Sequence, residues 1–242
     1  MKDHANARAT IFSILDTDGE SMEMIEGLNK RKSIRGFRPD PVPLHAIRTI
    51  LQAAARSPSY TNSQPWEVAV VTGDKRDQLS SLLYHLAAAG TPAATELPDP
   101  KGSWPEAINR RTQAHHARRF EFLDIKRDDA EKRDQFRLQN FKFFGAPCVM
   151  FFFLDKSLGP WSLIDIGIFI QSVSLAVQGL GLGCCMQASL ANYPDQVRSF
   201  LNIPDHKKLI VGMSLGYPDH DIPINQYISS REDIDAFTRW HA

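Results

Sequence analysis

The chain has 242 residues, and its 28 lysines and arginines balance 28 aspartates and glutamates, so the formal net charge is zero. This length allows one sizeable hydrophobic core and requires no second domain. A neutral chain lacks the positive field of nucleic-acid-binding proteins, and no segment is typical of a base-reading module, so we expect no nucleic-acid partner. Cys148, Cys184 and Cys185 are an odd number of cysteines without metal-ligand spacing. They predict free thiols, no metal site and a cytoplasmic protein.

The first part of the chain predicts mainly helices. Residues 1–20 lack strong periodicity, which predicts an arm or a frayed helix, and the first six residues lack the apolar core of a signal peptide. After that arm we expect, in order, a helix over Met22–Lys30, a helix over Leu44–Arg56, a strand over Glu67–Thr72 and a helix over Lys75–Ala89.

The middle of the chain combines a polar region with one very apolar strand. Residues 90–105 are rich in proline and glycine and predict a loop, which polar helices over Glu106–Leu123 and Asp128–Phe143 follow. Cys148–Leu154 is continuously apolar. Such a run is typical of a strand that is buried on both faces.

The stretch Trp161–Leu180 is long and apolar enough to span a bilayer. It also carries Asp165 and several amide and hydroxyl groups, which are costly in hydrocarbon, so it predicts a buried helix and no membrane segment. A strand near Cys184–Ala188, a helix over Pro194–Leu201 and a strand over Leu209–Leu215 follow, before a tail with few core signals. Helices that flank apolar strands indicate a layered α/β or α+β domain.

Two segments hold the candidate binding residues. Arg31-Lys32-Ser33-Ile34-Arg35 offers three cations and a hydroxyl group, and this set matches phosphate because guanidinium groups bind it through two hydrogen bonds at once. Pro58–Trp66 is bounded by prolines and offers hydroxyl, amide and aromatic groups. Alternatively, the first segment is a solvated charged face and the second is a turn. Together they suit a ligand with an anionic end and a polar ring.

The order of these motifs carries a family resemblance. Arg-Lys-Ser-x-Arg, then a helix, then Pro-Ser-x-x-Asn-x-Gln-Pro-Trp leading into a strand, resembles the nitroreductase family of FMN-dependent oxidoreductases. Asp165-Ile166-Gly167 at the start of the apolar helix and Gly212–Pro218 in the last strand extend the resemblance over most of the chain. Phe141–Pro147 is similar to members that act on nitrobenzoate-type substrates.

The resemblance implies an α+β fold, a three-layer sandwich in which helices flank a central mixed, mainly antiparallel sheet. A single domain would span residues 1–242, with a lid or insertion over about residues 90–140. FMN would lie at the interface of a homodimer, and a domain-swapped C-terminal tail over about residues 217–242 would pack on the partner subunit and add a strand. NADH or NADPH would reduce the flavin, and a nitroaromatic or quinone-type acceptor would follow in the same pocket.

Carried over by position, the resemblance implies a cofactor site. FMN would carry the chemistry, so no side chain is expected to act as a catalytic acid or nucleophile. The implied contacts are Arg31, Lys32 and Ser33 at the phosphate end with Arg35 nearby, Arg231 as a second phosphate anchor, Pro58, Ser59, Tyr60 and Asn62 from the other subunit, and Met186 and Gln187 beside the reactive edge of the flavin. Alternatively, the Gln187 amide caps backbone groups at a strand end.

The lid region offers candidate contacts for the acceptor. It is rich in arginine and histidine, and it includes His115, Arg118 and Gln139 as candidate substrate residues. A cationic lid suits an anionic aromatic acceptor. The alternative is a solvated helix face, which is the usual role of a charge-rich helix.

Two other functions stay open on the sequence alone. The protein could bind flavin to store or sense it, without turnover. The Gly212-x-Ser214-x-Gly216 pattern also matches the nucleophile elbow of serine hydrolases. That elbow needs a helix directly after the serine, and Pro218 leaves no helix to receive the turn.

Overall fold

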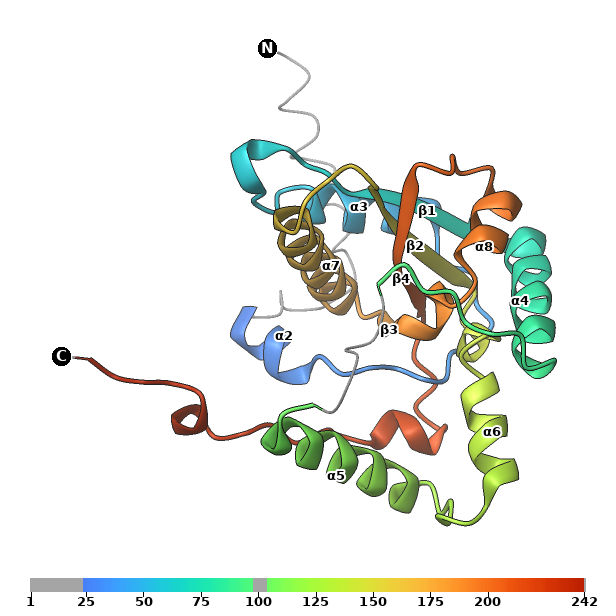
Figure 1. The fold of residues 1–242 in the computed structure, drawn as a ribbon, viewed down its shortest axis with the longest axis vertical. Coiled ribbons are helices and arrows are strands. Elements are labelled where there is room, and N and C mark those ends of the chain that lie inside the picture. The colour runs from blue at the N-terminus through green and yellow to red at the C-terminus, as the bar shows by residue number, and fades with distance from the viewer. Residues whose placement is uncertain (1–23, 98–103, 242) are drawn as a thin grey trace.

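A computed structural model of the chain describes residues 24–97 and 104–241 (Figure 1). The predicted arm over residues 1–20 lies outside these residues, as do the start of the first predicted helix and part of the predicted loop at 90–105. The α-helices are α2 (Met24–Lys30), α3 (Leu44–Ala54), α4 (Gly73–Ala88), α5 (Glu106–Phe122), α6 (Ala130–Leu138), α7 (Trp161–Gly179) and α8 (Pro194–Leu201). The strands are β1 (Glu67–Thr72), β2 (Cys148–Asp155), β3 (Gly183–Gln187) and β4 (Lys207–Gly216).

The four strands form one sheet in the order β1-β2-β4-β3. All three strand pairings are antiparallel. The parallel component is a single bridge between Ser33 and Cys184, where the chain before α3 runs beside β3. The sheet is therefore mixed and mainly antiparallel, as the family resemblance predicted.

Strand β2 places side chains in both layers of the core. Val149, Phe151 and Phe153 belong to one apolar cluster, and Met150 and Phe152 belong to the other. All five are nearly inaccessible to solvent. Because successive side chains of a strand point to opposite faces, a continuously apolar strand requires cover on both faces.

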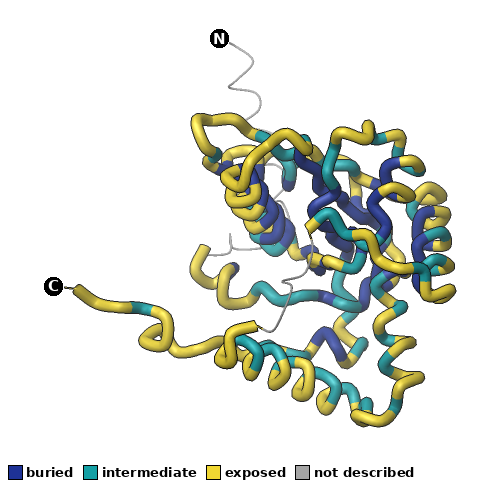
Figure 2. The backbone as a smooth tube through the Cα atoms, in the orientation of Figure 1, coloured by how far each residue is buried: buried dark blue, intermediate teal, exposed yellow. Residues whose placement is uncertain are grey.

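Helices supply that cover (Figure 1). Leu79 and Leu83 of α4, with Val197 of α8, belong to the same cluster as Phe151. Ile50 of α3 and Phe169 of α7 belong to the cluster on the opposite face. In Figure 2 the buried segments coincide with the sheet and the inner sides of these helices. The predicted three-layer α+β sandwich is confirmed.

One predicted boundary is wrong. The helix expected to run to Phe143 ends at Leu138. The chain then turns, and Phe143 and Phe144 adopt positive φ angles of 55° and 52°. Phe141 and Phe143 are buried in the core beside the sheet. Burial of these aromatic rings outweighs the helical preference of the segment, since a large side chain contributes more by burial than a residue does by helix propensity.

Helix α7 is a core helix with one exposed face. Within the described part of the chain it alone is long and apolar enough to cross a membrane, and 44% of its apolar window is buried in the fold. Asp165 lies inside the domain and is 5% exposed. Ile164 and Ile168, one turn apart, are 54% and 38% exposed. The buried side matches the prediction, and the exposed isoleucines leave an apolar strip on the surface.

Helix α5 and the C-terminal segment reach away from the sandwich (Figure 1). They run side by side, and the hydroxyl of Tyr227 lies 3.2 Å from Nδ1 of His115. The described tail forms short 3-10 turns at Pro223–Gln226 and Ile234–Ala236 and no strand within this chain. Ile228, Phe237 and Trp240 are each more than 70% exposed.

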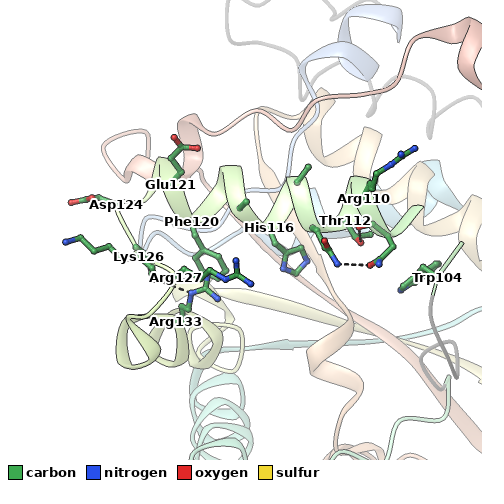
Figure 3. Close-up of a pocket in the computed structure, with 15 residues that line it drawn as sticks. Trp104, Arg110, Thr112, His116, Phe120, Glu121, Asp124, Lys126, Arg127 and Arg133 are labelled. Atoms are coloured by element: carbon green, nitrogen blue, oxygen red, sulfur yellow. Dashed lines mark hydrogen bonds between the residues drawn. The ribbon is translucent and has the colours of Figure 1, made fainter. Parts of the chain in front are cut away.

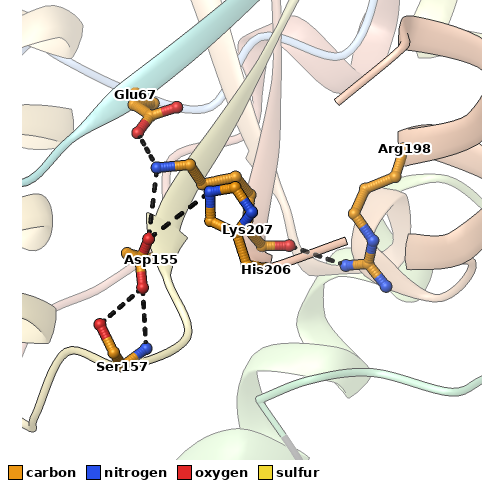
Figure 4. A network of polar contacts seen from close by, with 6 residues as sticks. All are labelled: Glu67, Asp155, Ser157, Arg198, His206 and Lys207. Carbon is orange, nitrogen blue, oxygen red and sulfur yellow. Dashed lines mark hydrogen bonds and ion pairs between the residues drawn. The ribbon is translucent and has the colours of Figure 1, made fainter. Parts of the chain in front are cut away.

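A polar network ties three strands together at one edge of the sandwich (Figure 4). The ammonium group of Lys207 on β4 pairs with Glu67 on β1 and, at 3.4 Å, with Asp155 on β2. Asp155 also accepts hydrogen bonds from the amide and the hydroxyl of Ser157, at 3.0 and 2.6 Å. These contacts fix the end of β2 where the chain leaves the sheet.

Candidate functional site

The basic segment Arg31–Arg35 lies against the edge strand β3. The amide of Ile34 donates to the carbonyl of Cys184 at 3.0 Å. Gly183 permits this close approach, because a Cβ there would lie 2.6 Å from Cγ1 of Ile34. A side chain at that position would force the basic segment away from the sheet. A glycine in β3 therefore positions the predicted phosphate-binding cations.

These cations have no acidic partner within residues 24–97 and 104–241. No carboxylate there forms an ion pair with Arg31, Lys32 or Arg35. The backbone of Arg35 is fixed, since its amide donates to Oδ1 of Asn225 at 2.7 Å. Three half-buried cations on a fixed backbone, with a hydroxyl between them, fit the phosphate of a mononucleotide.

The second predicted segment is a strained loop that α7 holds in place. Thr61, Asn62 and Gln64 adopt positive φ angles of 49°, 59° and 45°. The buried carboxylate of Asp165 accepts a hydrogen bond from the amide of Tyr60 at 3.0 Å. Backbone in this region is uncommon for residues other than glycine and persists where surrounding contacts fix it. The fold therefore holds the loop in one defined conformation, and the exposed groups of the loop are available to a ligand.

The structure does not bring the two segments together within one chain. Tyr60 stacks on Trp161 at the first residue of α7, with ring centroids 5.6 Å apart. The basic segment lies beside Cys184, whose thiol meets Ser174 near the other end of α7. Ser174 lies 13 positions after Trp161, which corresponds to about 20 Å along the helix axis. The two halves of the predicted site therefore lie at opposite ends of α7.

The two predicted residues of β3 differ in exposure. Met186 is 58% exposed, whereas Gln187 is 3% exposed. The side-chain amide of Gln187 donates to the backbone carbonyl of Asn140 at 3.0 Å, and its carbonyl accepts from Ser214. The Gln187 side chain is thus engaged inside the protein, in line with the alternative that it caps backbone groups. Its neighbour Met186 presents a side chain to the surface.

The hydrolase alternative is wrong. Ser214 lies within β4, is fully buried and donates its hydrogen bond to Gln187. Strand β4 continues to Gly216, so no helix begins directly after the serine. A nucleophile elbow exposes its serine at a sharp turn between a strand and a helix. A hydroxyl sealed in the middle of a central strand cannot meet a substrate.

The three predicted substrate residues lie in different places. His115 lies on α5 and contacts Tyr227. Arg118, on the same helix, is exposed. Gln139 lines a separate hollow of about 430 Å³ with Tyr84 of α4. Only His115 has a contact that joins it to another segment near the basic residues.

A larger cavity of about 1450 Å³ separates α5 from α6 and the turn between them (Figure 3). His116 and Phe120 lie on the same side of α5, and Arg133 of α6 lies against Phe120 with its guanidinium carbon 4.4 Å from the ring centroid. The region expected to form a lid therefore contains two helices, α5 and α6, that run in different directions (Figure 1) and enclose a hollow with a partly aromatic lining.

Two residues of the site were missed by sequence reasoning. In the sequence, Asp165 stands out only as part of a motif and as a charged group that disfavours a membrane helix. In the structure its carboxylate accepts a hydrogen bond from the amide of Tyr60 and so anchors that loop. In the sequence, Arg119 is one of several charged residues of the lid region. In the structure its side chain is half-buried, and burial and then the charge of Arg35, 84 positions earlier in the chain, lower its pKa. A buried acid at the start of an apolar helix was the one available signal for Asp165. Nothing in the sequence separates Arg119 from Arg118.

A mainly antiparallel sheet between two helical layers, with an unpaired basic segment against its edge strand, defines an α+β protein with a site for an anionic cofactor. The chain belongs to the nitroreductase family, whose sequence model matches residues 28–217. The chain is 32% identical to a 4-nitrobenzoate reductase of Pseudomonas putida over 214 residues, which are 87% of this chain and 92% of that protein. It is 33% identical to a nitrobenzene nitroreductase of Ectopseudomonas oleovorans, again over 87% of this chain and 93% of the relative.

A solved structure has the same fold. The FMN-dependent nitroreductase NfnB of Mycobacterium smegmatis, in complex with NADPH, superposes with a TM-score of 0.86 at 29% sequence identity. The alignment covers 91% of this chain and all of that one. The family predicted from the motifs is confirmed.

Proposed function

We propose that this protein is an FMN-dependent oxidoreductase that uses NADH or NADPH to reduce a nitroaromatic or quinone-type acceptor. The observation that carries the proposal is the unpaired basic segment Arg31–Arg35, held against β3 by Gly183. The names of the relatives support the same activity, as do the FMN dependence of NfnB and its complex with NADPH.

The chain's own side chains would bind and orient the cofactor. Arg31 and Lys32 would hold the phosphate and Ser33 the ribityl end, and Met186 would offer an exposed apolar surface beside the ring. FMN, when bound, supplies the redox chemistry, accepting a hydride from the nicotinamide and passing the reducing equivalents to the acceptor. No side chain of the site is required as an acid, a base or a nucleophile.

We propose further that the active protein is a homodimer built on the exposed face of α7. Ile164 and Ile168 leave an apolar strip on this helix. A two-fold axis that passes through this strip, perpendicular to α7, would relate the helix to its copy in the partner. Such an axis reverses the direction of the helix, so the two copies of α7 would pack antiparallel. The loop at Tyr60 of one chain would then lie beside the basic segment of the other. This arrangement completes the site, which one chain leaves divided between the two ends of α7.

The exposed tail supports the same assembly. The tail residues Ile228, Phe237 and Trp240 gain little from folding in a single chain, and a partner surface would bury them. Arg231, which bonds only to Ser229 and Ser230 within the described residues, would reach a phosphate group in the assembled dimer. We place the dimer in the cytoplasm, since Cys148, Cys184 and Cys185 are buried free thiols.

The purified protein tests the activity directly. We expect it to copurify with FMN, to lose the flavin absorbance when NADPH is added without oxygen, and to regain it when 4-nitrobenzoate or a quinone follows. A protein that binds FMN but is not reduced by NADH or NADPH would be a flavin store or sensor. A protein that stays colourless after incubation with excess FMN would contradict the proposal.

A further inference from the structure

Arg119 of helix α5 has a buried polar atom without a partner. Among the residues that the structure describes, its Nε finds no hydrogen-bond acceptor. The side chain is half-buried, and no carboxylate in the described parts of the chain forms an ion pair with it. A buried polar group without a partner costs free energy, and a charged group costs more. A charged group in this state is therefore a candidate contact for an anionic ligand.

Other cations surround this arginine. Burial lowers the pKa of Arg119, and the charge of Arg35 lowers it further. Burial also lowers the pKa of His115, followed by the charges of Arg119, His116 and Arg35. The guanidinium groups of Arg119 and Arg35 repel one another in the absence of an anion. The cluster joins three segments that are far apart in the sequence: the basic segment at Arg35, helix α5, and the tail at Tyr227, which contacts His115.

The cluster is lined with aromatic rings. The guanidinium carbon of Arg119 lies 5.3 Å from the ring centroid of Phe120 and 5.4 Å from that of Phe136. Phe120 also lines the cavity between α5 and α6 (Figure 3). The cationic cluster and the cavity therefore adjoin at Phe120. A ligand with a planar apolar body and one negative group matches this combination, because the rings pack on the body and the guanidinium forks pair with the anion.

We propose that Arg119, together with His115, binds the carboxylate of an aromatic acid and so makes the enzyme selective for anionic acceptors. The inference rests on the proposed function, since the acid is the electron acceptor. The FMN phosphate is assigned to the separate cations Arg31 and Lys32. Arg119 is thereby left free to meet a second anion. A carboxylate suits a guanidinium group, because the planar fork can donate two parallel hydrogen bonds to it.

The experiment compares an acid with its neutral isostere. The kcat/KM values of the FMN-loaded enzyme are measured for 4-nitrobenzoate and 4-nitrobenzamide in the wild type, Arg119→Gln, Arg119→Lys and Arg111→Gln. Arg111→Gln removes the same charge from an exposed position of the same helix. We expect Arg119→Gln to lower kcat/KM for 4-nitrobenzoate by about 10- to 100-fold, chiefly through KM, as loss of a charge-assisted hydrogen bond predicts. Values for 4-nitrobenzamide should change by less than about threefold.

Two further measurements make the result decisive. Arg119→Lys keeps the charge but loses the fork, so it should fall between the wild type and Arg119→Gln on the acid. Competitive inhibition by benzoate should weaken in Arg119→Gln, whereas inhibition by benzamide should not. Equal losses for acid and amide, or unchanged values for both, would overturn the proposal. So would a lowered FMN affinity or a shifted flavin potential in Arg119→Gln, because either would assign Arg119 to the cofactor. A wild-type enzyme that reduces neither of these compounds would overturn this inference, and one that also fails to reduce a quinone would overturn the proposed function as well.

Discussion

The backbone amide of Tyr60 donates a hydrogen bond of 3.0 Å to the buried carboxylate of Asp165, which lies 105 positions later in the chain. This bond fixes a loop of positive-φ residues to the first turns of α7. Ser63 approaches the second oxygen of the same carboxylate at 3.5 Å. One acid therefore holds the part of the site that the basic segment does not supply.

Replacing that acid tests the loop. Asp165→Ala leaves the Tyr60 amide without its partner, and we expect a loss of about 1–3 kcal/mol in the free energy of unfolding. We also expect FMN affinity to fall by about tenfold or more, because the loop no longer keeps its strained conformation. Urea titration and fluorescence titration with FMN measure the two effects. Asp205→Ala, at an exposed position, should change neither. FMN affinity at the wild-type level in Asp165→Ala would show that the loop does not contact the cofactor.

The basic segment gives a second prediction. Arg31→Ala with Lys32→Ala should weaken FMN binding by about 100-fold or more, because each charge-assisted contact to phosphate contributes about 1.5–3 kcal/mol. Riboflavin, which lacks the phosphate, should bind wild type and variant with similar affinity. Arg48→Ala, an exposed substitution on α3, serves as the control for the loss of charge. If FMN and riboflavin lost affinity equally, the cations would act on the ring or on folding and not on the phosphate.

The sequence predicts local patterns better than it predicts distant contacts. The apolar run at Cys148–Leu154 identified β2, because a strand covered on both faces is apolar at successive positions and the run is short enough for a strand. The end of α6 was missed, because the burial of Phe141 and Phe143 depends on a sheet that forms elsewhere in the chain. The hydrogen bond that the Ser214 hydroxyl donates to the side chain of Gln187 was missed for the same reason.

In the candidate site, too, the sequence predicted local motifs but not the contacts between distant segments. The cations at Arg31 and Lys32 and the loop at Tyr60 were visible as motifs. That they lie at opposite ends of α7 follows only from the packing of that helix against both segments. Arg119 differs from Arg118 only in the side of α5 that faces the fold, and a polar helix carries no periodic signal to show that side.

The network at Lys207 predicts a dependence of stability on pH. Hydrogen bonds from Ser157, and then Lys207, lower the pKa of Asp155 to about 2 from an ordinary value of 3.8. A carboxyl group with a lowered pKa in the folded state stabilises the fold above its unfolded pKa, and this contribution is lost as pH falls through the folded pKa. The window is therefore about pH 4 to pH 2.

The variant Asp155→Asn measures that contribution. At pH 7 its thermal midpoint should lie below that of the wild type, and the difference should shrink as pH falls from 4 toward 2, where the wild type also becomes uncharged. Asp128→Asn, at an exposed position without a side-chain partner in the described residues, should show no such change. A difference that is constant over the whole range would mean that the charge of Asp155 contributes nothing and that only its shape matters.

The proposed dimer makes a prediction that no single variant can test, because each cofactor site would take its basic segment from one chain and its loop from the other. Arg31→Ala/Lys32→Ala and Asp165→Ala are coexpressed with different affinity tags, and the mixed dimer is isolated by both tags in turn. If sites form between chains, one of the two sites in the mixed dimer has all its wild-type residues. FMN occupancy should then reach about half of the wild-type value, as two-fold symmetry requires. Each parent alone should stay nearly empty. If both halves came from the same chain, every site in the mixed dimer would carry a defect and occupancy would stay at the level of the parents.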